Sequence, residues 1–156
     1  MKNKKGFTLV ELLAVIVILA VIILIAVNAV LPQMRKARRN SFTDEVINFG
    51  KAAETKYVAD SISTPEAGQA GVSGTDSQGK PTMCYTIAQL KGTYVSKNDS
   101  DYSGIVILTI DGDNISKKVT MKNKEFYVNA VNTATKDFEV KDYTSTDWAA
   151  LTTTCE

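Results

Sequence analysis

Hydrophobic side chains form one long run near the N-terminus. Residues 12–31 carry no charge, and Asn28 is the one strongly polar residue among them. A helix of about twenty residues rises about 30 Å, which matches the hydrocarbon core of a bilayer. The run is too long for the apolar centre of a secretory signal peptide, and no small-residue cleavage site follows it. The pattern therefore predicts one membrane-spanning helix that is retained.

Beyond this run, apolar positions recur at helical spacing. Five residues follow one another at intervals of four, three, four and four: Phe42, Val46, Phe49, Ala53 and Tyr57. Such intervals place side chains on one face of a helix. We therefore expect an amphipathic helix over residues 35–62, whose aromatic stripe packs in a core rather than against a cofactor.

The C-terminal half has the composition of strands and turns. Residues 104–121 read as two β-branched runs around a turn at residues 111–114, and a third run follows at residues 125–131. Residues 84–94 predict a strand that runs into a short helix ended by Gly92. Residues 138–141 predict a final strand, and Trp148 is expected to bury against the sheet. The fold class is thus α+β, with a long N-terminal helix packed on a small antiparallel sheet over residues 83–156.

The segment between the helix and the sheet has no periodicity. Residues 63–82 are rich in Ser, Gly, Thr and Pro, which predicts a loop. A loop of this length is usually functional or mobile, so it is a candidate surface for contacts with other molecules.

The composition argues against an enzyme. The chain has no histidine, which removes the commonest general base and the most frequent zinc ligand. A Ser/Lys pair is the remaining catalytic alternative. Asp111 and Asp113 supply too few ligands for calcium. We expect no enzymatic activity, no metal and no cofactor. The formal net charge of +1 gives no overall field that would favour nucleic acid.

The two cysteines, Cys84 and Cys155, both follow the apolar run. If that part of the chain is exported, they can pair in an oxidising compartment, and the disulfide would fasten the C-terminal tail. Two buried free thiols are the alternative.

A short motif precedes the apolar run. Residues 4–11 read KKGFTLVE, with a basic leader, a Gly, a Phe and a single Glu in front of the long apolar stretch. This arrangement resembles the class III signal sequence of type IV pilins and pseudopilins. The resemblance is close over residues 4–31 and looser over the rest of the chain, where it implies the pilin fold.

The resemblance implies how the chain is processed. In this family a membrane-embedded prepilin peptidase cuts after the Gly that matches Gly6 and methylates the new N-terminal residue, here Phe7. Residues 1–6 would then be a cleaved leader that carries three lysines and no acid. A Gly at the cut also suits a peptidase that must reach the backbone carbonyl.

Glu11 places a carboxylate at the edge of the apolar run. A charge inside hydrocarbon costs several kcal/mol, so such a residue is a candidate functional site. The amine of Phe7, once freed, is a cation in the same layer, and each charge is tolerable when paired, either within one chain or between neighbouring subunits. In the family, the matching glutamate meets the amine of a neighbouring subunit and sets axial register during assembly. The alternative is a carboxylate that snorkels to the membrane edge.

Two features lie at the end of the apolar run. Pro32 is the candidate for the helix break that family members often have, with local melting over residues 28–32. Family members usually have this proline about one turn earlier. The basic residues at positions 35–39 favour an interfacial anchor or contacts with acidic neighbours over binding to DNA.

These expectations define a structural subunit rather than a catalyst. Residues 7–34 would form the transmembrane and filament-core helix of a homo-oligomeric helical filament that serves adhesion or surface motility. The precursor would be a single-pass protein of the cytoplasmic membrane, surrounded by lipid before assembly, and the filament would be extracellular. The family implies prepilin peptidase, an assembly ATPase and a platform membrane protein as partners, and no nucleic acid. The alternatives are a minor pilin or pseudopilin of a secretion or DNA-uptake system, and an anchored binding domain that never polymerises.

Overall fold

The computed structural model describes residues 6–62, 72–91, 101–151 and 154–155. The chain divides into two compact units, Met1–Arg38 and Arg39–Glu156. The first unit consists of the N-terminal part of helix α1, and the second holds the rest of α1 and a sheet.

Helix α1, Leu9–Ile62, is continuous through Pro32. The predicted helix break is therefore absent from this structure. A proline inside a helix removes one backbone hydrogen bond at a cost of about 3 kcal/mol, and the turns on both sides of Pro32 keep their own bonds. The Asn28 side chain also hydrogen-bonds within the helix, because its Nδ2 donates to the Leu24 carbonyl at 3.2 Å. Melting of residues 28–32 in an assembled filament stays a prediction.

The second unit is built on a six-stranded antiparallel sheet in the order β1-β2-β3-β4-β5-β6. Each strand pairs with the next one along the chain, so the predicted meander is confirmed. The strands are β1 Val72–Thr75, β2 Pro81–Thr86, β3 Ser103–Asp111, β4 Asn114–Lys122, β5 Phe126–Asn132 and β6 Lys141–Asp142.

Part of the predicted loop over residues 63–82 is wrong. Residues 63–71 lie outside the described residues, but residues 72–75 form β1 and residue 81 begins β2. Between them, Asp76 Oδ1 accepts hydrogen bonds from the backbone N–H groups of Gln78 and Lys80 at 2.9 and 2.8 Å, which closes a tight turn. The final strand was also predicted too early, because β6 begins only at Lys141.

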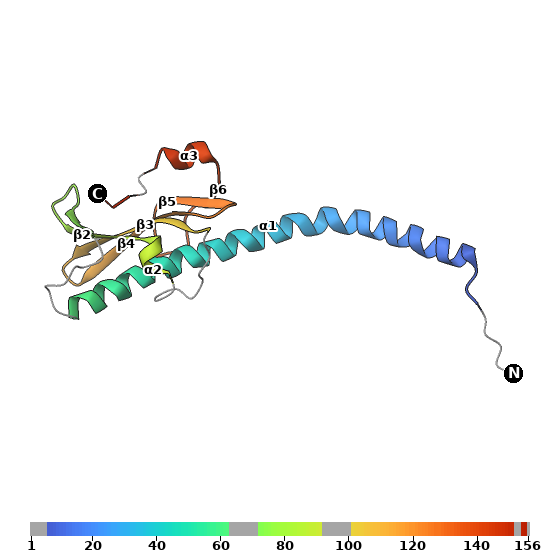
Figure 1. The fold of residues 1–156 in the computed structure, drawn as a ribbon, viewed down its shortest axis with the longest axis horizontal. Helices are drawn as coiled ribbons and strands as arrows, with labels where there is room; N and C mark the ends of the chain where they lie inside the picture. Colours follow the sequence, from blue (N-terminus) through green and yellow to red (C-terminus); the bar gives the residue numbers. More distant parts are fainter. Residues whose placement is uncertain (1–5, 63–71, 92–100, 152–153, 156) are drawn as a thin grey trace. The chain divides into compact units, whose positions relative to one another are not determined.

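The core lies between one face of the sheet and the C-terminal half of α1 (Figure 1). Phe42, Val46, Phe49 and Ala53 are fully buried there, and Tyr57 packs against them, which confirms the predicted stripe. The sheet contributes alternate residues, as a half-buried strand must. These include Met83 and Tyr85 of β2, Val106 and Leu108 of β3, and Val119 and Met121 of β4.

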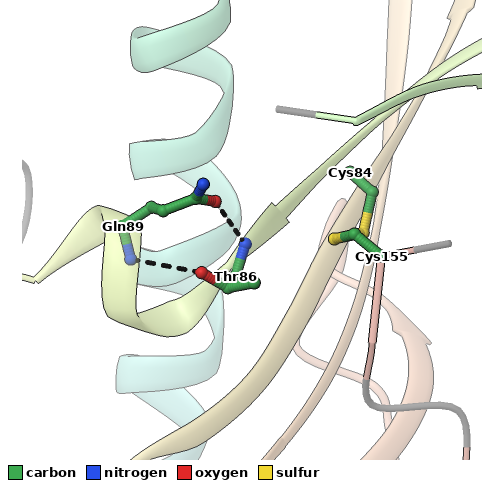
Figure 2. Close-up of a disulfide and its surroundings, with 4 residues drawn as sticks. All are labelled: Cys84, Thr86, Gln89 and Cys155. Carbon is green, nitrogen blue, oxygen red and sulfur yellow. Dashed lines mark hydrogen bonds between the residues drawn. A yellow bond between two sulfur atoms is a disulfide. The ribbon is translucent and has the colours of Figure 1, made fainter. Parts of the chain in front are cut away.

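Local signals set two of the connections. Gly112 has φ +59 in the two-residue turn between β3 and β4, which fits the turn predicted at residues 111–114. Helix α2, Ile87–Leu90, follows β2 directly and begins with a capping box. In this box Thr86 Oγ1 accepts from the Gln89 N–H, and Gln89 Oε1 accepts from the Thr86 N–H (Figure 2). The predicted helix end at Gly92 lies outside the described residues.

Candidate functional site at the start of helix α1

The predicted cleavage site lies just outside α1. Residues 6–8 precede the helix, which begins at Leu9. Gly6 is exposed, and a Cβ built on it would meet no atom within 4 Å. The Phe7 side chain is 85% exposed. A peptidase can therefore approach the bond between these two residues without unwinding the helix.

Thr8 and Glu11 form a capping box at the start of α1. The Thr8 carbonyl accepts the first helical bond, from the Leu12 N–H at 3.3 Å, so Thr8 is the N-cap residue. The Glu11 N–H donates to Thr8 Oγ1 at 3.3 Å, and the Thr8 N–H donates to Glu11 Oε2 at 2.9 Å. This box satisfies two backbone donors that the first turn would otherwise leave without partners.

The Thr8 hydroxyl also holds the Glu11 carboxylate directly. Thr8 Oγ1 donates to Glu11 Oε2 at 2.9 Å, so two bonds from Thr8 converge on that one oxygen. Glu11 Oε1 receives neither of them. The carboxylate is thus folded back over the first turn, towards the chain end that cleavage would expose. Sequence reasoning missed this cap, although the Thr-x-x-Glu spacing of residues 8–11 is its signature.

The apolar surface of α1 in the first unit is uncovered. The large hydrophobic side chains from Phe7 to Met34 are all about half exposed or more. Within the described residues, α1 is the one helix long and apolar enough to cross a membrane. A continuous apolar surface of this size requires lipid or other helices around it.

A disulfide between Cys84 and Cys155 is present, as predicted. Cys84 alternates along β2 with the buried Met83 and Tyr85, so it lies on the sheet face turned away from α1. Figure 2 shows the bond between this strand and the C-terminal segment. The bond closes a separation of 71 residues in the sequence.

The C-terminal segment makes a second attachment through Lys122. Lys122 Nζ donates to the Tyr143 hydroxyl at 2.9 Å and lies over the rings of Tyr143 and Trp148, at 4.4 and 5.2 Å from their centroids. Trp148 belongs to helix α3, Ser145–Ala149, and is partly buried rather than enclosed in the core. The predicted contact of Trp148 with the sheet is therefore made through the Lys122 side chain of β4.

A cavity of about 540 Å³ lies between α1 and the chain before β6. Two ion pairs involve its lining residues: Arg39 lies 3.0 Å from Asp142 of β6, and Lys136 lies 2.6 Å from Asp44. In the part of the chain that the structure describes, no group of three or more His, Cys, Asp or Glu side chains could hold a metal ion. The two ion pairs connect α1 with Asp142 of β6 and with Lys136 in the chain before β6.

The N-terminal residues match a known family. Residues 1–27 match the family model described as the prokaryotic N-terminal methylation motif. The match supports the type IV pilin and pseudopilin family. It covers Gly6, Phe7, Thr8 and Glu11, and it supports a type IV pilin-like precursor. No curated protein and no solved structure matches the chain.

The matched motif has consequences for how the N-terminal segment is processed. Its class III signal implies processing by prepilin peptidase and assembly of the pilin type. Pilins are structural proteins rather than enzymes. The signal and the uncovered apolar helix together fit a precursor anchored in a membrane.

Proposed function

We propose that the chain is the precursor of a type IV pilus subunit that serves adhesion or surface motility. Prepilin peptidase cuts after Gly6 and methylates Phe7, and the subunit then polymerises through residues 7–34 into an extracellular helical filament. Residues 39–62 of α1 belong to the second unit and pack on its six-stranded sheet. An assembly ATPase and a platform membrane protein drive the extraction of the subunit from the cytoplasmic membrane.

The observation that carries this proposal is the continuity of three features on one helix. The methylation motif of residues 1–27 contains the capped carboxylate of Glu11, and the exposed apolar surface of α1 continues beyond it. Moving this surface from lipid into contact with other helices gains little hydrophobic energy, so packing and charge pairing must supply specificity. A buried ion pair is poor for raw stability but can specify register. Glu11 and the amine of Phe7 are the charges in that position.

A processing experiment tests the proposal. The full chain is expressed in a host with its own pilus machinery, the cells are sheared, and the sheared material is analysed by intact mass and N-terminal sequencing. We expect wild-type polymer that begins at methylated Phe7. Glu11→Ala should be processed yet absent from the polymer. Glu139→Ala is the matched control, because Glu139 is exposed in the second unit.

Other outcomes identify the other candidate functions. Protein that stays in membranes with residues 1–6 attached would be an anchored binding domain, and the proposal would be wrong. Processed protein that occurs only as a trace component of filaments, or only with a secretion or DNA-uptake system, would be a minor pilin or pseudopilin.

A further inference from the structure

Three basic side chains follow the apolar run of α1 after a short gap. Arg35, Lys36 and Arg38 are all exposed, and residues 32–34 separate them from Leu31. They belong to the same compact unit and the same helix as the run, so the helix alone fixes their distance from it. We call these three residues the basic collar.

The collar lies at the depth of lipid headgroups when the run spans a bilayer. At 1.5 Å per residue, residues 35–38 are about 6 to 10 Å beyond Leu31 along the helix axis. The headgroup layer extends roughly 5 to 8 Å beyond the hydrocarbon core on each side. Long basic side chains can also bend towards this layer. The three cations therefore reach the level of the lipid phosphates.

The direction of the three side chains favours lipid over a single protein partner. Successive residues of a helix turn by about 100°, so the collar spreads over an arc of roughly 160°. Headgroups surround a helix that stands in a membrane and can meet the whole arc at once. One neighbouring protein surface would face only part of it.

The next basic residue, Arg39, has a different role and does not belong to the collar. Arg39 begins the second unit, where it pairs with Asp142 at 3.0 Å and lies 5.7 Å from the Phe126 ring centroid. Arg39 therefore belongs to the second unit, whereas the collar lies in the first unit. Arg39 lies within the arc of the collar but is left out of it.

We propose that the basic collar binds the phosphate groups of anionic lipids in the leaflet at the C-terminal end of the apolar run. This inference rests on the membrane-anchored stage of the proposed function. Guanidinium groups suit phosphate because they bind two oxygens at once. Each cation near an anionic surface raises the affinity about fivefold, and salt weakens this effect. The collar thus adds a salt-sensitive contact with anionic lipid to the anchoring that the apolar run supplies.

The test compares the full wild-type chain with two variants that each lose three positive charges. Wild type, the collar variant Arg35→Gln/Lys36→Gln/Arg38→Gln and the control variant Lys51→Gln/Lys118→Gln/Lys141→Gln are reconstituted in vesicles of equal parts phosphatidylglycerol and phosphatidylcholine. The control removes the same charge from exposed lysines of the second unit. The protein is then extracted in mild detergent, and the two lipids that remain bound are counted by native mass spectrometry. All forms keep the leader lysines, so their contribution cancels.

We expect the ratio of bound phosphatidylglycerol to bound phosphatidylcholine to be at least fivefold higher for wild type and for the control variant than for the collar variant. Arg35→Lys/Arg38→Lys keeps the charge and should retain most of the preference, which separates electrostatics from loss of folding. Equal lipid ratios in all forms would overturn the proposal. The proposal would also be overturned by a collar variant that inserts with an unchanged lipid ratio but no longer polymerises. The collar would then contact neighbouring subunits rather than lipid. Wild type that alkaline carbonate removes from the vesicles would instead refute the membrane stage, and both proposals with it.

Discussion

Thr8 and Glu11 close the first turn of α1 by holding each other. The Thr8 N–H and hydroxyl both donate to Glu11 Oε2 at 2.9 Å, and the Glu11 N–H donates back to Thr8 Oγ1 at 3.3 Å. A carboxylate near a helix N-terminus is also stabilised by the helix dipole. Glu11, which we propose to set subunit register, is therefore also part of the capping box of its own helix. The position of its carboxylate depends on Thr8.

Substituting Thr8 tests this dependence. Thr8→Val keeps the β-branched shape but removes the hydroxyl, and the loss of such a cap costs about 1 kcal/mol. That energy corresponds to about a fivefold change in an equilibrium, so we expect about fivefold less processed subunit in sheared filaments. Thr8→Ser keeps the hydroxyl and should assemble almost as well as wild type. Assembly of Thr8→Val at the wild-type level would show that the cap does not position Glu11.

The disulfide should dominate the stability of the second unit. A cross-link between Cys84 and Cys155, 71 residues apart, is worth about 4 kcal/mol in the loop-entropy account. We expect Cys84→Ser/Cys155→Ser to lower the free energy of unfolding by about that amount, measured by urea titration of the full chain in mild detergent. Trp148 is the single tryptophan and reports on the C-terminal segment directly. Wild type in reductant is the control and should match the variant. A loss below about 1 kcal/mol would mean that Lys122 and its two rings hold the segment alone.

An ion pair between the residue before β2 and the last residue of β3 gives the second unit a pH dependence. Lys80 Nζ and Asp111 Oδ2 are 2.7 Å apart. The hydrogen bond to Asp111, and then the charge of Asp111, raise the pKa of Lys80 above its ordinary value of 10.5. The folded chain then binds this proton more tightly than the unfolded chain. The stabilisation is therefore complete below pH 10.5 and is lost as the pH rises through the raised pKa.

Asp111→Asn checks the sign of this effect. At neutral pH we expect wild type to have a higher urea midpoint than the variant, and the difference should close as the pH rises above 10.5. Asp113→Asn removes an exposed acid from the same turn and should keep the wild-type pH dependence. A difference that grows with pH would contradict the assignment.

The elements that burial defines could be predicted from the sequence. The stripe from Phe42 to Ala53 and the alternation in β3 and β4 follow from packing on one core, which fixes the period of apolar residues. Strand β1 carries no such period, because it is an edge strand of Val, Ser, Gly and Thr held by its backbone pairing with β2. Backbone pairing does not require alternating apolar side chains, so the hydrophobic pattern does not predict this strand.

The candidate site was predicted in part for a similar reason. Gly6, Phe7 and Glu11 could be found because their motif is contiguous in the sequence. The expected break at Pro32 is absent from this structure, where the other turns of α1 are intact, and a break in an assembled filament stays a prediction. The close approach of Gly50 to Thr133 could not be predicted, since it joins α1 to the end of β5 across 83 positions of the chain.

Gly50 of α1 lies close to Thr133, which follows β5. A Cβ on Gly50 would lie 2.5 Å from Thr133 Oγ1 and 3.2 Å from Thr133 Cβ. In an open helix, Gly→Ala stabilises by about 1 kcal/mol. Here overpacking opposes that gain, and we expect Gly50→Ala to lower the free energy of unfolding by about 1 to 3 kcal/mol. The measurement is urea unfolding of the full chain in mild detergent.

Thr133→Ala provides the partner for a double-mutant cycle. Among the described residues, buried Thr133 Oγ1 has no hydrogen-bond partner, so its removal should cost little. It also removes the atom closest to the new Cβ. Gly50→Ala should therefore be much less harmful in the Thr133→Ala background, with a coupling energy of about 1 to 2 kcal/mol. If Gly50→Ala instead raises the free energy of unfolding of the otherwise wild-type chain, the Thr133 side chain can turn away at little cost. Helix propensity, rather than close packing, would then determine the effect of the substitution.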